Sequence, residues 1–542
     1  MKHLGKNISK KKPLLLAGAL LLSTSILSGC GDSGLVKVKV GEYPNQAASN
    51  AKISKEFATS AKALTDSAFQ FFREIARIPR QSKSLDKIST YITSFASYRG
   101  YSPTTDEAGN IAFDVPATKG YEDYPKIILQ AHLDMVVSWS DDNASFDPIN
   151  DAIHLEEDDE SFHSDGKTNI GADDGEGICT LLAIADSDSS TCVHGPLRFL
   201  FTTDEDIGLV GAQALDPAFL DSNYLINVDA SCVGEIIYAA AGSALGEFKT
   251  TSEMQSIPEG YSLLEISVSG LKGGHSSLHA SQTLLGASKV LINALKTVKT
   301  SVQSWYLSSM EAGEVSNAIP TKGSLKVAVP SQSKDEVLNK IKADYNSLKT
   351  SYPDETSASF NCKEISSGEA KVYGSSTSGN VYALLSSLPD GTIDGSEDSQ
   401  TSSNVSPVSI SNGSISVSSL FRSLKNSVLN EAKNNFSSYA SQYGFTYSLG
   451  TDFLAWEQDK EDSFINLFYN GLKTACGLEG VKSKCAGGLE TSLFATKKSG
   501  MHMLSIGADV TGEHVISEKL YKKSFPTHMA AILSTLKNIN TL

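Results

Sequence analysis

Apolar and polar positions along the chain alternate between a helical and a strand period, and this alternation predicts the elements of the fold. Apolar residues recur at helical spacing from Leu64 to Ile78, where Pro79 ends the helix, and a second amphipathic helix covers 88–95. Three β-rich runs and one more helical stretch follow, in the order 127–130, 177–185, 197–202 and 224–228. Strands that alternate with helices favour an α/β layer fold with its chemistry at the strand ends.

The pattern changes near residue 245. Strand and helix signals then alternate without acidic clusters, at 263–268, 283–298, 324–329 and 335–348. A Ser-, Gly- and Thr-rich stretch from 366 to 419, interrupted only by 381–388, predicts long surface loops or an embellished edge of this second unit. Helix and strand signals resume at Asp452. A chain of 542 residues is long enough for two cores.

The first thirty residues have the pattern of an export signal. Five lysines precede an apolar run, Leu14 to Leu27, that is short for a membrane span. The run ends in Leu-Ser-Gly-Cys30, which resembles the lipobox of bacterial lipoproteins, where the cysteine is diacylated; an ordinary signal peptide with a chance cysteine is the alternative. We predict a lipoprotein signal peptide at 1–29, lipidation of Cys30 and a tether at 30–58. The protein would then be anchored at the cell envelope without spanning the membrane.

The charge of the chain excludes one class of partner. The formal net charge is −16 and becomes −21 without the five lysines of the signal peptide, and no basic run remains. Nucleic acid is therefore not an expected partner. The six cysteines after Cys30 show no zinc-finger spacing, so we expect them to be buried as small hydrophobic residues.

Four acidic stretches and one late histidine carry the candidate chemistry. They are QAHLDMV (130–136), GADDGEG (171–177), TTDEDIG (202–208), INVDAS (226–231) and GEH, which ends at His514. Metal-activated hydrolysis needs imidazole and carboxylate ligands, a base for the water and a group that stabilises the oxyanion. These stretches supply such residues. If His514 completes the site, the C-terminal segment folds back onto the first unit and the middle region is an inserted domain.

Single residues in these stretches have ordinary alternatives. His132 follows a buried strand and Asp134 points to the same side, so Asp134 can orient the imidazole. The adjacent Glu205 and Asp206 diverge, so one can bind metal while the other addresses the water. Taken alone, Asp173 or Asp174 is better explained as the cap of a helix.

Together the motifs resemble the M20 family of metallopeptidases, and most closely its aminoacyl-histidine dipeptidase branch. The resemblance extends over nearly the whole chain after residue 30. The segments that carry it besides the acidic stretches are FREIARIPRQS (72–82), DEAGNI (106–111), GLKGGHSS (270–277), SNAIP (316–320), FRS (421–423) and GGLETSLF (487–494).

By this resemblance, Asp173 bridges two divalent ions, usually zinc, with manganese or cobalt as alternatives. His132 and Asp229 complete one metal site, and Asp206 and His514 complete the other. It also implies a di-metal catalytic domain, an α/β fold with a mixed sheet between helices, in two parts at 59–243 and 450–542. An inserted α+β lid domain at 244–449 interrupts it.

The resemblance assigns the remaining roles as well. Glu205 is the general base, Asp134 orients His132 from behind, and His275 of the lid helps to stabilise the oxyanion. Asn317 and Arg422 grip the substrate backbone and its C-terminal carboxylate. For Arg422 a surface arginine on a helix remains the alternative.

The chain also departs from the family pattern. Asp206 stands where a glutamate is common, the loop 486–490 lacks its usual histidine, and 515–518 replaces a usual Ser-Pro followed by acids. We therefore predict metal-dependent hydrolysis of dipeptides or short peptides, with Xaa-His dipeptides among them. The alternatives are an M20 amidohydrolase of N-acyl amino acids and a non-catalytic peptide-binding lipoprotein, and a homodimer is left open.

Overall fold

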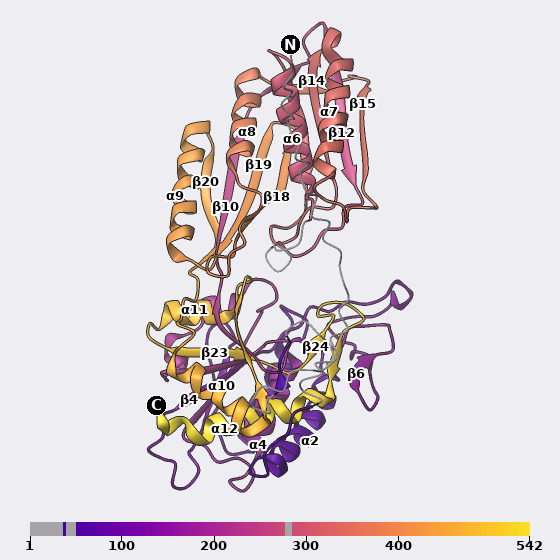
Figure 1. Ribbon diagram of the computed structural model, residues 1–542. Helices are drawn as coiled ribbons and strands as arrows, with labels where there is room; N and C mark the ends of the chain where they lie inside the picture. The colour runs from indigo at the N-terminus through magenta and orange to yellow at the C-terminus, as the bar shows by residue number, and fades with distance from the viewer. Residues whose placement is uncertain (1–35, 40–49, 277–283) are drawn as a thin grey trace, which may run out of the picture. The chain divides into compact units, whose positions relative to one another are not determined.

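The computed structural model describes residues 36–39, 50–276 and 284–542, and this part of the chain contains two large sheets with helices packed on them (Figure 1). The predicted signal peptide and Cys30 lie outside the described residues. In the described part, no helix combines the length and the apolar character that crossing a bilayer would require.

The first sheet has eight strands and contains both parallel and antiparallel pairs. Its order is β2 (Thr104–Thr105), β3 (Ile111–Val115), β7 (Leu197–Thr202), β4 (Ile127–His132), β8 (Tyr224–Val228), β23 (His502–Ile506), β9 (Glu235–Ala240) and β22 (Val481–Cys485). The C-terminal strand β23 runs parallel to β8 and lies between β8 and β9. The C-terminal segment therefore does fold back onto the first unit.

Helices cover the two faces of this sheet. One core joins the sheet to α2 (Ala58–Ile75), α3 (Asp86–Tyr98), α4 (Ala172–Asp186), α10 (Ser463–Cys476) and α12 (Phe525–Asn538). A smaller core joins it to α5 (Val210–Ala214) and α11 (Glu490–Lys497). A four-stranded sheet, in the order β24 (Val510–Thr511), β25 (Lys519–Tyr521), β6 (Ser161–Ser164) and β5 (Leu155–Glu157), completes this domain. The mixed sheet between helices is the predicted arrangement.

Part of the segment predicted as a tether, 30–58, is instead bound to this domain. Strand β1 (Val36–Lys37) pairs in parallel with β21 (Leu478–Glu479). The N–H groups of Lys52 and Ser54 donate hydrogen bonds to the carbonyls of Cys476 and Ala475. These backbone hydrogen bonds leave no signal in side-chain periodicity, which is why the prediction was wrong for these residues.

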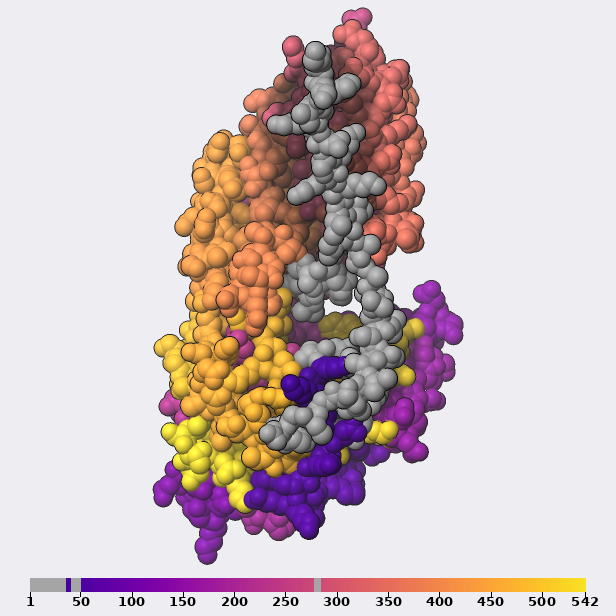
Figure 2. Space-filling view, viewed as in Figure 1, coloured from indigo at the N-terminus to yellow at the C-terminus, as the bar shows by residue number. Residues whose placement is uncertain are grey.

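The second sheet belongs to the inserted α+β domain and is antiparallel along its main path. Its order is β15 (Ser359–Ile365), β12 (Tyr261–Ser269), β14 (Gly323–Pro330), β13 (Tyr306–Ala312), β18 (Thr401–Ser411), β19 (Ser414–Ser423), β10 (Gly242–Thr251) and β20 (Thr446–Phe453). Its core includes residues of α6 (Ala287–Ser301), α7 (Lys334–Lys349), α8 (Ser375–Ser387) and α9 (Asn426–Tyr443). Figure 2 shows the outer surface of α9, in orange, near the sheet edge formed by β20. The domain begins at β10 and ends with β20, slightly beyond the predicted 244–449.

The Ser-rich stretch 366–419 was expected to form long surface loops or an embellished edge of the domain, and that prediction was wrong. It contains α8, and β18 and part of β19 lie in the middle of the sheet. Its buried hydroxyl groups bond one another, as Thr401 Oγ1 with Ser423 Oγ at 2.8 Å and Ser403 Oγ with Ser419 Oγ at 3.2 Å. Buried polar groups are tolerated when they are paired in this way, so serine content alone did not indicate exposure.

Candidate active site

The candidate site lies at the carboxyl ends of three adjacent parallel strands. His132 is the last residue of β4, Asp229 directly follows β8, and Asp206 follows β7. Parallel strands end at the same edge of a sheet, which is where open α/β sheets place their ligands. The structure therefore brings these side chains together, as their positions in the sequence predict.

Asp173 stands between two imidazoles. Its Oδ1 lies 3.1 Å from His132 Nε2 and its Oδ2 lies 3.1 Å from His514 Nε2. His132 Nε2 is also 3.7 Å from Asp229 Oδ1, and His514 Nε2 is 2.9 Å from Asp206 Oδ1. One carboxylate thus presents one oxygen to each of two histidine-carboxylate pairs, which is the arrangement that a bridging ligand requires.

Asp174, the neighbour of Asp173, has a different task. Its Oδ2 accepts a hydrogen bond from the His132 N–H and its Oδ1 accepts one from the Gly177 N–H, both at 2.9 Å. Asp174 therefore joins the start of α4 to the end of β4. The capping function that sequence alone allowed for either aspartate falls to Asp174.

Asp134 lies behind His132. Its Oδ1 is 3.3 Å from His132 Nδ1 and accepts a hydrogen bond from the Glu205 N–H at 2.9 Å, while its Oδ2 accepts one from Ser82 Oγ at 2.7 Å. Asp134 is fully buried. One carboxylate thus orients the imidazole and also holds the backbone of Glu205.

Asp206 reaches His514 although it is shorter than the usual glutamate. Its Oδ1 is the atom 2.9 Å from His514 Nε2, and its Oδ2 accepts a hydrogen bond from the Val136 N–H at 2.9 Å. Burial would lower the pKa of His514, but hydrogen bonds with Asp173 and Asp206 raise it to about 11. The shorter side chain is therefore long enough to reach both His514 and the Val136 N–H.

The donor set fits divalent cations. Asp173, Asp206 and His514 offer ligand atoms within 4.8 Å of one another. Burial and neighbouring carboxylates raise the pKa of Asp229 and that of Glu205 well above their ordinary values. The site therefore holds more carboxylate groups than its two imidazoles can neutralise, and imidazole with carboxylate is the ligand set that zinc and similar ions prefer.

The predicted oxyanion residue His275 and the predicted substrate-binding residue Asn317 lie side by side on the inserted domain. His275 forms an isolated antiparallel bridge with Ala318, and the Ser276 N–H donates to the Asn317 carbonyl at 2.9 Å. Asn404 Nδ2 donates to the carbonyls of Ser316 and Ala318, which holds this loop in place. The structure thus brings His275 and Asn317 together on two neighbouring loops of the inserted domain, whereas the acidic site lies at the strand ends of the first sheet.

Arg422 is on a strand, β19, and not on a surface helix. Its neighbours on the adjacent strands are Ser243 of β10 and Ser402 of β18. Burial lowers the pKa of Arg422, and Cys485 and Glu205 oppose this effect. Its Nε has no hydrogen-bond partner within the described part of the chain. A buried guanidinium with an unused donor is suited to an incoming carboxylate.

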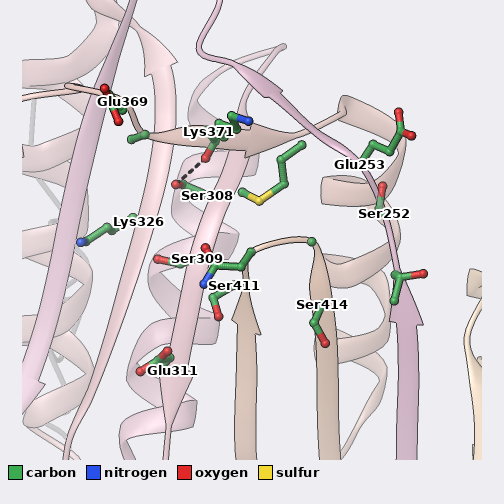
Figure 3. A pocket seen from close by; sticks show the side chains of 15 residues that line it. Ser252, Glu253, Ser308, Ser309, Glu311, Lys326, Glu369, Lys371, Ser411 and Ser414 are labelled. Atoms are coloured by element: carbon green, nitrogen blue, oxygen red, sulfur yellow. Dashed lines mark hydrogen bonds between the residues drawn. The ribbon is translucent and has the colours of Figure 1, made fainter.

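A separate pocket lies in the inserted domain, with a volume of about 1180 Å³ (Figure 3). Serines and ionisable side chains line it, among them Ser309, Ser411, Glu311, Lys326 and Lys371. Its lining includes neither histidine nor cysteine, and it contributes to none of the clusters of metal-ligand atoms found in the described residues. The candidate metal ligands therefore lie apart from this pocket.

Sequence reasoning missed three buried residues beside the site. Arg80 and Glu518 contact the turn before Asp173, and Glu490 lies beneath β4 and β7. Arg80 and Glu490 are within the motifs 72–82 and 487–494, so those segments pointed to them without giving a role. Glu518 is in the segment where the chain departs from the family pattern.

The chain is similar to known dipeptidases over most of its length, although no family model matches it. It is 27% identical to the cytosol non-specific dipeptidase of Escherichia coli K12, over 87% of this chain and 97% of that protein. The crystal structure of aminoacylhistidine dipeptidase from Vibrio alginolyticus matches with a TM-score of 0.74 and 27% identity, over 87% of this chain and 96% of that one. An M20 family metallo-carboxypeptidase from Sulfolobus solfataricus has the same fold at 13% identity, with a TM-score of 0.51 over 88% and 99% of the two chains. These similarities confirm the predicted α/β fold and the prediction of a hydrolytic enzyme.

Proposed function

We propose that this protein, a relative of the M20 metallopeptidases that shares their fold, hydrolyses dipeptides or other short peptides at the site around Asp173. The observation that carries the proposal is the Asp173 carboxylate, whose two oxygens each lie 3.1 Å from a different imidazole. His132 and Asp229 would hold one divalent ion, and Asp206 and His514 the other. Bound there, two such ions would polarise the scissile carbonyl and make a water molecule more acidic.

The chain's own residues would handle the proton and the substrate. Glu205 takes the proton from the attacking water and delivers it to the leaving amine, a task that suits a carboxylate with a raised pKa. Asp134 holds the His132 imidazole and the backbone of Glu205 in position. Arg422 binds the substrate carboxylate, and His275 and Asn317 bind its carbonyl oxygen and backbone.

Activity assays on the purified protein test this proposal. Activity is measured after chelation and after Zn²⁺, Mn²⁺ or Co²⁺ is restored, against β-Ala-His, Gly-His, dialanine and an N-acetyl amino acid. We expect cleavage of dipeptides that requires metal, and preferential cleavage of the N-acetyl compound would favour the amidohydrolase alternative. Glu205→Gln should lower kcat by about 10²- to 10⁴-fold while metal remains bound. Full activity of this variant would exclude the assigned base, and a pure peptide binder would cleave nothing.

The second part of the proposal concerns location. The lysine-rich start, the apolar run and the lipobox-like end at Cys30 support lipidation and anchoring at the cell envelope. Cys30→Ser should release the protein from the membrane fraction. A variant that stays membrane-bound would contradict the anchor.

A further inference from the structure

The turn before the regular helix of α4 is held by Glu518, a residue from the far end of the chain. The N-cap Gly171 has a φ of 62° and no side chain. Glu518 Oε2 accepts hydrogen bonds from the N–H groups of Ile170 and Gly171 at 2.9 and 2.7 Å, and Oε1 accepts one from Asp173 at 3.1 Å. Asp173 and Asp174 are not helical, so this turn lies before the regular helix, which Asp174 caps. Glu518, only 1% exposed, therefore fixes the backbone of the turn that carries Asp173.

Arg80 holds the same turn from its other side. Its guanidinium donates to the carbonyl of Gly171 and, at 2.8 Å, to that of Asp134. These contacts join the turn before Asp173 to the segment that follows His132. A Cβ on Gly171 would lie 2.6 Å from Met135 Sδ and as close to the guanidinium, so this approach requires a glycine.

We propose that Glu518 and Arg80 form a clamp that sets the position of Asp173 between the two metal sites, and that Glu518 couples this position to His514. The loop from His514 to Glu518 is closed by the Glu518 N–H, which donates to the Val515 carbonyl at 3.0 Å. Glu518 thus connects the loop that supplies one imidazole to the turn that supplies the shared carboxylate. Both are positioning residues, and the inference rests on the proposed function because the spacing serves two cations.

The geometry shows why a carboxylate is needed. Three backbone donors converge on two oxygens, and each oxygen is an acceptor only while the group is a carboxylate. In Glu518→Gln one oxygen becomes an NH₂ group that faces N–H donors. The variant keeps the size of the side chain and breaks part of the clamp.

Metal titration tests the clamp without relying on activity. Metal-free wild type, Glu518→Gln and the control Glu513→Gln, which removes a charge from the same loop outside the clamp, are titrated with Zn²⁺ by calorimetry. We expect two ions to bind to wild type and to the control. In Glu518→Gln the first ion should bind as in wild type and the second about 10- to 100-fold more weakly, as for other residues that orient metal ligands.

Two further measurements keep the test decisive. Far-UV circular dichroism of the metal-free proteins checks folding, and Glu518→Asp, which retains the charge but shortens the reach, replaces the glutamine variant if that one does not fold. Wild-type affinity for both ions in the folded variant would overturn the clamp alone. A wild-type protein that binds fewer than two ions would overturn the proposed function together with the clamp.

Discussion

The two halves of the candidate site are built differently. The His132 side chain is 1% exposed, ends a central strand and has Asp134 behind it, whereas the His514 side chain is 43% exposed on a loop. His514 also has a φ of 64°, which residues other than glycine seldom adopt. The core of the sheet positions the first half, while the second depends on contacts made by a loop.

The first half also has a polar layer beneath it. Gln130 of β4 donates to Glu490 Oε2 at 2.5 Å, Thr202 of β7 donates to the same atom at 2.9 Å, and Asn227 of β8 donates to Gln130 Oε1 at 2.8 Å. The three strands that deliver the ligands are therefore joined by side chains as well as by backbone. Variants in the two halves should consequently affect stability and metal binding to different extents.

Removing each imidazole should give the largest contrast. His132→Ala leaves Asp134 and Asp229 without their buried partner, so we expect loss of activity and a metal-free protein destabilised by about 3 kcal/mol. His514→Ala should abolish activity too, but change the metal-free stability little because the ring is partly exposed. Urea unfolding in chelator measures both, and equal destabilisation would contradict the distinction.

Glu490→Gln tests the polar layer through pH. Burial raises the pKa of Glu490 from 4.5 to about 7. The folded protein thus binds the proton more tightly than the unfolded chain, and the stability this contributes is present below pH 4.5 and lost as pH rises through about 7. Glutamine stays neutral. The melting temperature of the variant, relative to that of wild type, should therefore increase between about pH 5 and pH 8. This relative increase corresponds to at most about 3 kcal/mol in the free energy of unfolding.

The exposed Glu156→Gln serves as a control for this experiment. Parallel pH profiles of Glu490→Gln and wild type would show that the layer does not titrate.

Asp206→Glu probes the loop-dependent half. The added methylene cannot keep both the Val136 hydrogen bond and the approach to His514. We expect the second ion to bind about tenfold more weakly, with the first unaffected. Tighter binding in calorimetry would show instead that the shorter aspartate limits this site.

A surface ion pair near the C-terminal segment should have the smallest effect. Glu157 accepts hydrogen bonds from Arg73 Nε at 2.8 Å and from Lys522 Nζ at 2.6 Å, and Arg73 lowers the pKa of Glu157 to about 2. Its contribution is present above its ordinary pKa of 4.5 and is lost as pH falls through about 2. Because the pair is more than a third exposed, Glu157→Gln should cost about 0.2 to 1 kcal/mol at pH 7, and less at high salt. A larger loss of unfolding free energy, measured with urea, would show that these surface ion pairs help to hold the loop that carries His514.

The sequence predicts where the candidate ligands at the sheet edge lie, because a carboxylate or imidazole at the end of a buried apolar strand is costly unless it has a partner. His132 and Asp229 are such cases, and both are where the strand pattern places them. It also predicts that the C-terminal segment returns to the first unit, once His514 is included in the ligand set.

Other features could not be read from local pattern. The roles of Glu518 and Arg80 depend on hydrogen bonds to backbone groups that lie far away in the sequence. The strands β18 and β19 were missed because their serines are buried in mutual hydrogen bonds. In each case the energy comes from tertiary pairing and not from local propensity.

Because β23 enters the first sheet between β8 and β9, a growing polypeptide on the ribosome cannot complete that sheet until residues 502–506 have been synthesised. Asp173 and His514 are 341 positions apart, so the whole inserted domain is translated between them. Contacts of such long range form late in folding. A chain that ends before residue 502 would therefore carry His132, Asp173, Asp206 and Asp229 without His514, and the candidate site would stay incomplete until synthesis has nearly finished.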